Sequence, residues 1–510
     1  MQYKRNRTKT TKWNIFFQYS NFIFVLISGI LLVPLYLKYI PANIYGYWLA
    51  TGNILNWVSL IDPGFSMVTQ QKVAFSYGNK RYDQVGKYAL SSLQLTLIFL
   101  VPITVLGMVF YFKFPEWIGI NDLIIQKQLQ TAFIYALIGT LFSFVSYTIV
   151  SINQGLQSSL GIGTIYVFSN VVGIVLTLCG LVYGYGIISL GIANIGRGGV
   201  LLLGNSIYLI VRFVEEKIKL LYDKSLAKEI FSLVSFNFLG KIGGIGNTQV
   251  ASFLIAKYLS PNDVIAYRFT LTIPETSKLL LGRPALALMP AVTHLLGEGD
   301  IQKSKQIFLR LLKYLIWASG LVLAGFIIFN KPFIGLWTDA KYYGGFGLNL
   351  VLVIWVVVST FTTSLSNMVF ALGDIKRNNI VRFIQSIFYI ILFMVSIHFW
   401  GLLGAGISLL IAEILVPLIY YPISFNKRIR LERELFIILG SEAIRVLLIS
   451  TALIVTLLLI NPAIDSWFVF VCWTVGLCFV YFIMLSISSL NFKNEINNFI
   501  HILKRKLAIN

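Results

Sequence analysis

The sequence predicts an all-α membrane protein with about 14 transmembrane helices. Of its residues, 57% are hydrophobic and only 12% are charged, and the mean hydropathy is +0.80, far from the composition of a soluble domain. The apolar residues form blocks of about 20 residues or more, long enough to cross ~30 Å of hydrocarbon as helices. Runs such as 350–358 are continuously apolar, which excludes the alternating pattern of a membrane β-barrel.

The first apolar block follows a basic segment and could be mistaken for a secretory signal. It is longer than the ~7 to 15 apolar residues of such a signal, so we interpret it as the first span. Taken in order, the blocks predict helices over 13–39, 45–75, 88–112, 129–153, 160–183, 187–211, 230–257, 264–293, 307–330, 344–372, 380–399, 402–425, 440–460 and 466–490.

Lys and Arg residues alternate between basic and nearly neutral loops along the chain. Most of the 41 lie in the two terminal segments and in every second loop, for example 212–228, 303–313 and 376–382. Because cytoplasmic loops carry the excess of positive charge, we expect both termini to be cytoplasmic. The net charge of +21 then faces anionic lipid, and its dispersal over many loops argues against a nucleic-acid partner.

The sequence resembles itself at a spacing of roughly 220 residues. Tyr39–Asn43 matches Tyr258–Asn262, and Gly186–Ile192 matches Gly401–Ile407. These matches predict two parallel six-helix lobes. The predicted organisation is a basic tail (1–12), an N-lobe (13–215), a linker (216–229), a C-lobe (230–425), two further helices with a preceding basic linker (426–490) and a cytoplasmic tail (491–510).

Two six-helix lobes, Gly-rich helix entries and the segment Pro41–Trp48 carry a family resemblance. The chain resembles the polysaccharide-transporter branch, the O-antigen (Wzx-type) flippases, of the multidrug/oligosaccharidyl-lipid/polysaccharide (MOP, MATE-like) superfamily. This resemblance implies a flippase in the bacterial inner membrane that moves an undecaprenyl-pyrophosphate-linked oligosaccharide by alternating access, such as an O-antigen or capsule repeat unit. It further implies membrane lipids, a polysaccharide polymerase and chain-length proteins as partners, and no cofactor. Helices 13 and 14 depart from the simplest O-antigen flippases and are similar to the lipid II flippase, whose last two helices help form a lipid-tail groove.

Five cations fall inside apolar blocks: Arg197, Lys241, Arg268, Lys278 and Arg283. Each costs about 2.5 to 3.5 kcal/mol at bilayer depth, so they must face a wet cavity, pair with acids or snorkel. On a helical projection Arg268, Glu275, Lys278 and Arg283 share one side. We predict a cationic cavity for a pyrophosphate. Snorkelling of Arg268 and Arg283, and pairing of Glu275 with Lys278, remain open.

Polar residues on other apolar blocks predict the rest of the cavity lining: Asn14, Gln18, Asn21, Asn194, Asn237 and Thr248. The candidate coupling acids are Asp62, Glu275 and Glu413, although Asp62-Pro63-Gly64 is equally typical of a helix break. No Cys/His spacing predicts a metal site.

Two alternative functions remain. A cation-coupled (MATE-like) exporter of small molecules would require excess acid in the cavity. A membrane glycosyl polymerase or ligase would require a sizeable outer loop, and the longest, around 113–128, is too short for a catalytic module. We therefore expect a flippase and not an enzyme.

Overall fold

The computed structural model describes residues 7–60, 65–231, 250–297, 300–372, 374–428 and 433–507, and all of its regular secondary structure there is helical. Nine helices in this described part are long and apolar enough to cross a membrane. The prediction of an all-α membrane protein is therefore confirmed. The chain divides into two compact units, residues 1–265 and 266–510, and each is described by itself.

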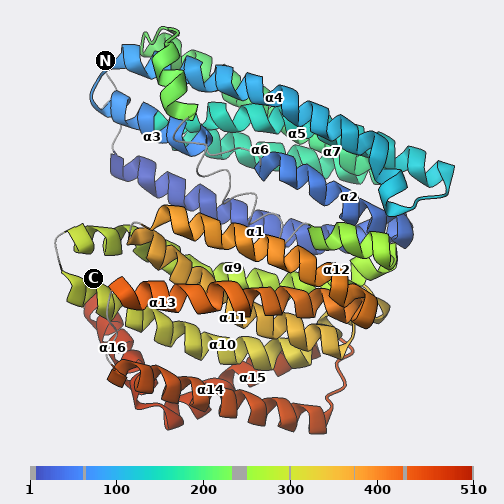
Figure 1. The fold of residues 1–510 in the computed structure, drawn as a ribbon, viewed down its shortest axis with the longest axis vertical. Helices are drawn as coiled ribbons and strands as arrows, with labels where there is room; N and C mark the ends of the chain where they lie inside the picture. Colours follow the sequence, from blue (N-terminus) through green and yellow to red (C-terminus); the bar gives the residue numbers. More distant parts are fainter. Residues whose placement is uncertain are drawn as a thin grey trace. The chain divides into compact units, whose positions relative to one another are not determined.

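The first unit contains seven labelled helices that lie alongside one another (Figure 1). They are α1 (Arg7–Tyr39), α2 (Ala42–Leu60), α3 (Phe65–Gly78), α4 (Tyr82–Ile118), α5 (Leu123–Gly155), α6 (Ser159–Val182) and α7 (Ile188–Glu215). The helix predicted over 45–75 corresponds to α2 and α3, and residues 61–64 lie outside the described part. Residues 224–231 and 250–258 are also helical.

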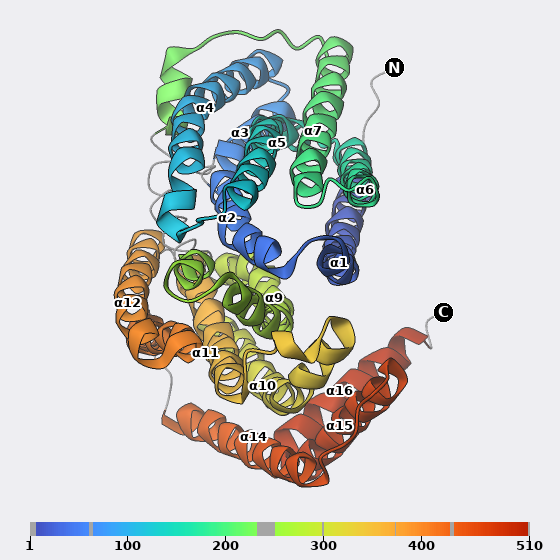
Figure 2. The ribbon, with the colours of Figure 1, turned by 90° about the vertical axis from the view of Figure 1, so that its right-hand side faces the viewer.

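Close glycine contacts fix the position of α7 between α5 and α6 (Figure 2). A Cβ atom on Gly198 would lie 2.2 Å from the carbonyl oxygen of Gly139, and a Cβ on Gly139 would lie 2.3 Å from the carbonyl carbon of Asn194. Only glycine permits this backbone approach, which is common where membrane helices pack. With one face of α7 held against α5, Arg197 lies over Gly173 of α6, the two positions being separated by ordinary van der Waals distance.

The second unit contains most of α9 and every later helix. Its elements are α9 (Pro261–Gly297), α10 (Ile301–Trp337), η1 (Ala340–Tyr342), α11 (Phe346–Ala371), α12 (Ile375–Glu413), the π-helical η2 (Ile414–Leu418), α13 (Ile419–Arg428), α14 (Arg433–Ile460), α15 (Trp467–Ser488) and α16 (Leu490–Leu507). Helix α16 was not expected from the apolar blocks, because Asn, Lys and Glu residues repeatedly interrupt its apolar positions.

The segment α12–α13 is a helical hairpin that reverses at Gly401. Its backbone leaves the helical region there, with φ 52° and ψ −132°, a conformation that is strained for residues with a Cβ. Beyond the turn the two arms contact each other: Gln385 Nε2 donates to Glu413 Oε2 at 2.9 Å, and the Tyr421 hydroxyl donates to Asn378 Oδ1 at 2.6 Å. The helices predicted over 380–399 and 402–425 are thus the two arms.

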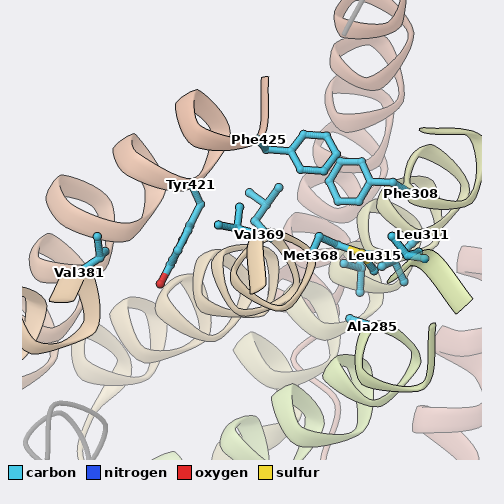
Figure 3. Close-up of a cluster of buried hydrophobic side chains, with 11 residues drawn as sticks. Ala285, Phe308, Leu311, Leu315, Met368, Val369, Val381, Tyr421 and Phe425 are labelled. Carbon is cyan, nitrogen blue, oxygen red and sulfur yellow. The ribbon is translucent and has the colours of Figure 1, made fainter. Parts of the chain in front are cut away.

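A hydrophobic cluster joins α9, α10, α11 and the α12–α13 hairpin (Figure 3). The rings of Phe308 on α10 and Phe425 on α13 lie with their centroids 3.9 Å apart. Met368 and Val369 of α11 complete the cluster from the side, and both are almost fully buried. This packing holds α11 against the hairpin, which sets the positions of the polar groups described below.

Helices α14 to α16 attach to α10 through a buried carboxylate. Glu442 is 0% exposed and accepts hydrogen bonds from Trp317 Nε1 at 2.9 Å and Ser489 Oγ at 2.7 Å. It also accepts from Asn491 at the start of α16 at 2.9 Å. Since a buried carboxylate is costly unless its oxygens are satisfied, these donors fix the α15–α16 junction against α10.

Candidate functional site

A cavity of about 300 Å³ lies within the first unit, among α1, α2, α6 and α7. Its polar and aromatic lining residues are Phe24, Ser28, Tyr36, Tyr45, Trp48, Asn170, Thr177, Asn194 and Arg197. Two residues predicted to line a cavity, Asn194 and Arg197, are therefore brought together here.

Arg197 carries the only formal charge among the described residues that line this cavity. Its Nη2 donates to the Tyr166 hydroxyl at 3.4 Å, and its guanidinium lies 5.9 Å from the centre of the Tyr166 ring. Its Nε is buried without a hydrogen-bond partner, and no acidic residue of the described part forms an ion pair with it. A guanidinium with donors to spare beside empty space is a site for an anion.

The rest of the lining suits a polyhydroxylated ligand. Tyr36, Tyr45 and Trp48 present aromatic rings, and Asn170 and Asn194 present amides that can both donate and accept. Ligand sites typically combine aromatic walls with a few convergent polar groups in this way. The cavity can therefore hold an anionic or sugar-like group.

In the second unit a polar cluster surrounds Glu413, which is 5% exposed. Its carboxylate accepts from Trp355 Nε1 at 3.3 Å, from Gln385 Nε2 at 2.9 Å and from the Thr362 hydroxyl. Lys278 Nζ lies 4.4 Å from the centre of the Trp355 ring, so its ammonium is stabilised by the ring face. Lys278 contacts this ring, and it forms no ion pair with Glu275 among the described residues.

A second group of polar residues continues from this cluster along the same helices. Arg382 Nη2 donates to Ser366 Oγ at 3.0 Å, and Ser366 Oγ donates to Asn378 Oδ1 at 2.8 Å. Arg382 was counted with the basic segment 376–382 and also falls within the helix predicted over 380–399; it lies inside α12.

The remaining predicted residues are dispersed. Arg268 and Glu275 are half-buried on α9, while Arg283 is exposed on the same helix. The others lie outside the part whose side chains the structure describes: Asn14, Gln18, Asn21, Asp62, Asn237, Lys241 and Thr248.

An apolar groove of about 230 Å³ lies between α9, α10 and α15. Phe326, Phe329 and Phe333 of α10 line it together with Phe470 and Leu477 of α15. A groove of this composition is suited to a hydrocarbon chain.

Sequence reasoning missed the donors that enclose Glu413, namely Trp355, Thr362 and Gln385. Thr362 and Trp355 lie seven positions apart on α11, so they share a helix face. That spacing was a usable signal, but a lone Trp or Thr within an apolar block is indistinguishable from a packing residue.

Comparisons with known proteins identify the fold. No protein-family model matches the sequence, and no curated protein matches it. Among solved structures the chain is similar to the lipid II flippase MurJ in an inward closed conformation, with 17% identity and a TM-score of 0.66 over 93% of this chain and 98% of that one. It is similar to an inward-facing MATE multidrug transporter of the MOP superfamily, with 14% identity and a TM-score of 0.63 over 79% and 93% of the two chains.

A third similar structure is the Vibrio cholerae MATE transporter VcmN in its bent form, with 15% identity and a TM-score of 0.54 over 83% of this chain and 98% of that one. The chain therefore has the same fold as these solved structures. At these identities the likeness concerns the fold.

Proposed function

We propose that the protein is a flippase that moves a lipid-linked oligosaccharide across the bacterial inner membrane by alternating access. The observation that carries this proposal is the cavity beside Arg197, where a guanidinium without an acidic partner in the described part meets aromatic rings and amides. The cation suits a pyrophosphate or an acidic sugar, and the rings and amides suit a sugar. The MOP fold supplies the supporting context.

The polar cluster in the second unit is proposed to couple transport to an ion. Glu413 is a carboxylate buried among neutral donors, and Lys278 contacts one of these donors, Trp355, through the face of its ring. A change in the protonation of Glu413 would alter the hydrogen bonds between α11 and both arms of the hairpin. Buried acids within membrane spans commonly serve such roles.

The lipid part of the cargo is proposed to lie in the apolar groove between α10 and α15. Its lining is almost entirely apolar, so it would accept part of a polyprenyl chain. Replacing Gly325 with Phe would fill this groove, since a Cβ there has its nearest neighbour 4.0 Å away.

The experiment that tests the proposal is delivery of the glycan to the cell surface in strains that carry Arg197→Ala, Lys241→Ala or Lys278→Ala at normal protein levels. A charge-assisted hydrogen bond contributes ~1.5 to 3 kcal/mol, so loss of the Arg197 contact should weaken cargo binding by about 10- to 100-fold. Normal export by all three variants would contradict the cationic mechanism. Lys341→Ala, which removes an exposed cation, is the matched control.

Transport of small cations separates this proposal from a MATE-like exporter. Cells that lack the protein are compared with cells that express it for efflux of a cationic dye. We expect no difference, because the described cavity lining carries a cation and no acid. Dye efflux that depends on the protein, with normal glycan delivery in its absence, would favour the exporter.

A further inference from the structure

A basic groove of about 850 Å³ lies between α9, α10 and α16 in the second unit. Two segments that are far apart in the sequence meet there, the N-terminal turns of α10 and the first half of α16. Arg310 Nε donates to Glu495 Oε1 at 3.1 Å, and Lys313 Nζ donates to Asn491 Oδ1 at 3.3 Å. Both segments belong to the predicted cytoplasmic side.

The lining of the groove combines cationic and apolar side chains. The cationic residues, here called the rim, are Lys303, Arg310 and Lys313, and the apolar residues, here called the floor, include Pro284, Leu288 and Ile307. Glu495 is the only acidic residue among the described residues that line it, so this lining has a net positive charge. Lys303 and Arg310 are 69% and 62% exposed, and they pair with Asp300 and Glu495 respectively, so an external anion would compete with these carboxylates for them.

The position of the groove along α10 matches the membrane boundary. Lys313 and Tyr314 precede the continuous apolar part of α10, which begins at Leu315, and Tyr residues are enriched where hydrocarbon meets the headgroups. We therefore expect the groove at headgroup level, with its apolar floor on α9 and α10.

The groove already holds a carboxylate in the manner of a bound anion. Glu495 accepts from Arg310 Nε and, at 3.1 Å, from the Tyr314 hydroxyl. A phosphate oxygen pair presents acceptors of the same kind to a guanidinium and a hydroxyl. Glu495 thus shows which donors an external anion would use, and it would compete with that anion.

We propose that this groove binds the headgroup of an anionic phospholipid, with the phosphate on Arg310 and Lys313 and the glycerol and first acyl carbons on the apolar floor. Basic pockets between membrane helices on the cytoplasmic side recognise such headgroups. An inorganic anion would leave the floor unused, and an acidic peptide would have to reach headgroup depth. The site is separate from the proposed cargo cavity and does not depend on it.

The test uses native mass spectrometry to measure how tightly the purified full chain in detergent binds dioleoyl phosphatidylglycerol and dioleoyl phosphatidylcholine. The anionic lipid should bind at least ten-fold tighter. Removal of both cations in Arg310→Gln/Lys313→Gln should weaken its binding by about 25-fold, about five-fold for each charge, while Lys341→Gln should have no effect. Equal binding of the two lipids, or an unchanged double variant, would overturn the proposal.

Three further arms distinguish a lipid site from a structural role. Lys303→Gln, which replaces a highly exposed rim residue, should weaken the binding of phosphatidylglycerol about five-fold without a change in unfolding temperature. Glu495→Gln should strengthen the binding of this lipid, because the competing carboxylate is gone. Weaker binding by Glu495→Gln would contradict the assigned geometry. Inorganic phosphate or polyglutamate that displaced the lipid at equal concentration would show a soluble anion or an acidic peptide as the ligand, and would also overturn the proposal.

Discussion

Arg197 and Glu413 are both ionisable groups within membrane-spanning helices, yet their surroundings are opposite. Arg197 borders a cavity and has Tyr166 as its hydrogen-bond partner, with Nε unsatisfied. Glu413 is enclosed by donors from Trp355, Thr362 and Gln385. A charge beside empty space is available to a ligand, whereas a charge with satisfied oxygens holds helices together.

The largest expected effect comes from Glu413→Ala. The substitution leaves three buried donors without an acceptor, so the free energy of unfolding should fall by about 3 kcal/mol. Thermal unfolding in detergent measures this, with Glu413→Gln, which keeps an acceptor, as the milder variant. Arg197→Met should change stability by less than about 1 kcal/mol, because one long hydrogen bond is lost. Equal losses of stability for Glu413→Ala and Arg197→Met would contradict the contrast between the enclosed Glu413 and the open Arg197.

The second largest effect is expected at the cavity beside Arg197. Gly173→Leu should fill the space beside Arg197, since a Cβ at residue 173 has its nearest neighbour, the Cβ of Arg197, 3.5 Å away. Cargo binding should weaken by about ten-fold or more while the helices stay folded. Gly199→Leu on α7 is the control, because nothing lies within 4 Å of its Cβ. Unimpaired binding in Gly173→Leu would place the cargo elsewhere.

A smaller effect is expected at the turn that positions Glu413. Gly401→Ala introduces a side chain at φ 52°, which should cost about 1 to 2 kcal/mol of stability. If the turn orders the coupling site, transport should fall in proportion to the loss of folded protein and regain its normal rate at lower temperature. Gly440→Ala, at a helical position with nothing within 4 Å, should be neutral or slightly stabilising.

The smallest effect concerns Asp223, a carboxylate that is half-buried, in contrast to the buried Glu413. The Ser225 hydroxyl donates to Asp223 at 2.6 Å, which lowers the pKa of Asp223 below its usual 3.8. Its contribution to stability is therefore complete above pH 3.8 and is lost as the pH falls through the lower pKa of the folded state. Asp223→Asn should unfold slightly more easily than the parent at pH 7 and equally easily at pH 2. A difference that persisted at pH 2 would assign the effect to packing.

The sequence was sufficient for the fold class, because a membrane-spanning helix needs a long apolar block and little else. The turn at Gly401 was also predictable, since two apolar blocks met at a glycine. Helix α16 was not, because an amphipathic helix is stabilised by the surface on which it packs, here α10 through Arg310 and Glu495, and that surface lies far away in the sequence.

The candidate site was predictable only in part. The cost of a charge in hydrocarbon singled out Arg197, Lys278 and Glu413, but periodicity could not say what each of them faces. Lys278 and Arg283 were expected on one side of their helix, and their surroundings are different: Lys278 contacts Trp355 and Arg283 is exposed. A projection fixes angles about one axis, and the contacts depend on the neighbouring helices.

The hairpin at Gly401 has a consequence for how the chain is made. Its arms close hydrogen bonds between Gln385 and Glu413 and between Asn378 and Tyr421, and all four residues belong to one short stretch of nascent chain. The entropic cost of closing so local a loop is small. The two arms of the hairpin can therefore enter the bilayer together, with these hydrogen bonds already formed, before α14 to α16 have been synthesised. The polar side chains would then be paired while hydrocarbon surrounds the hairpin.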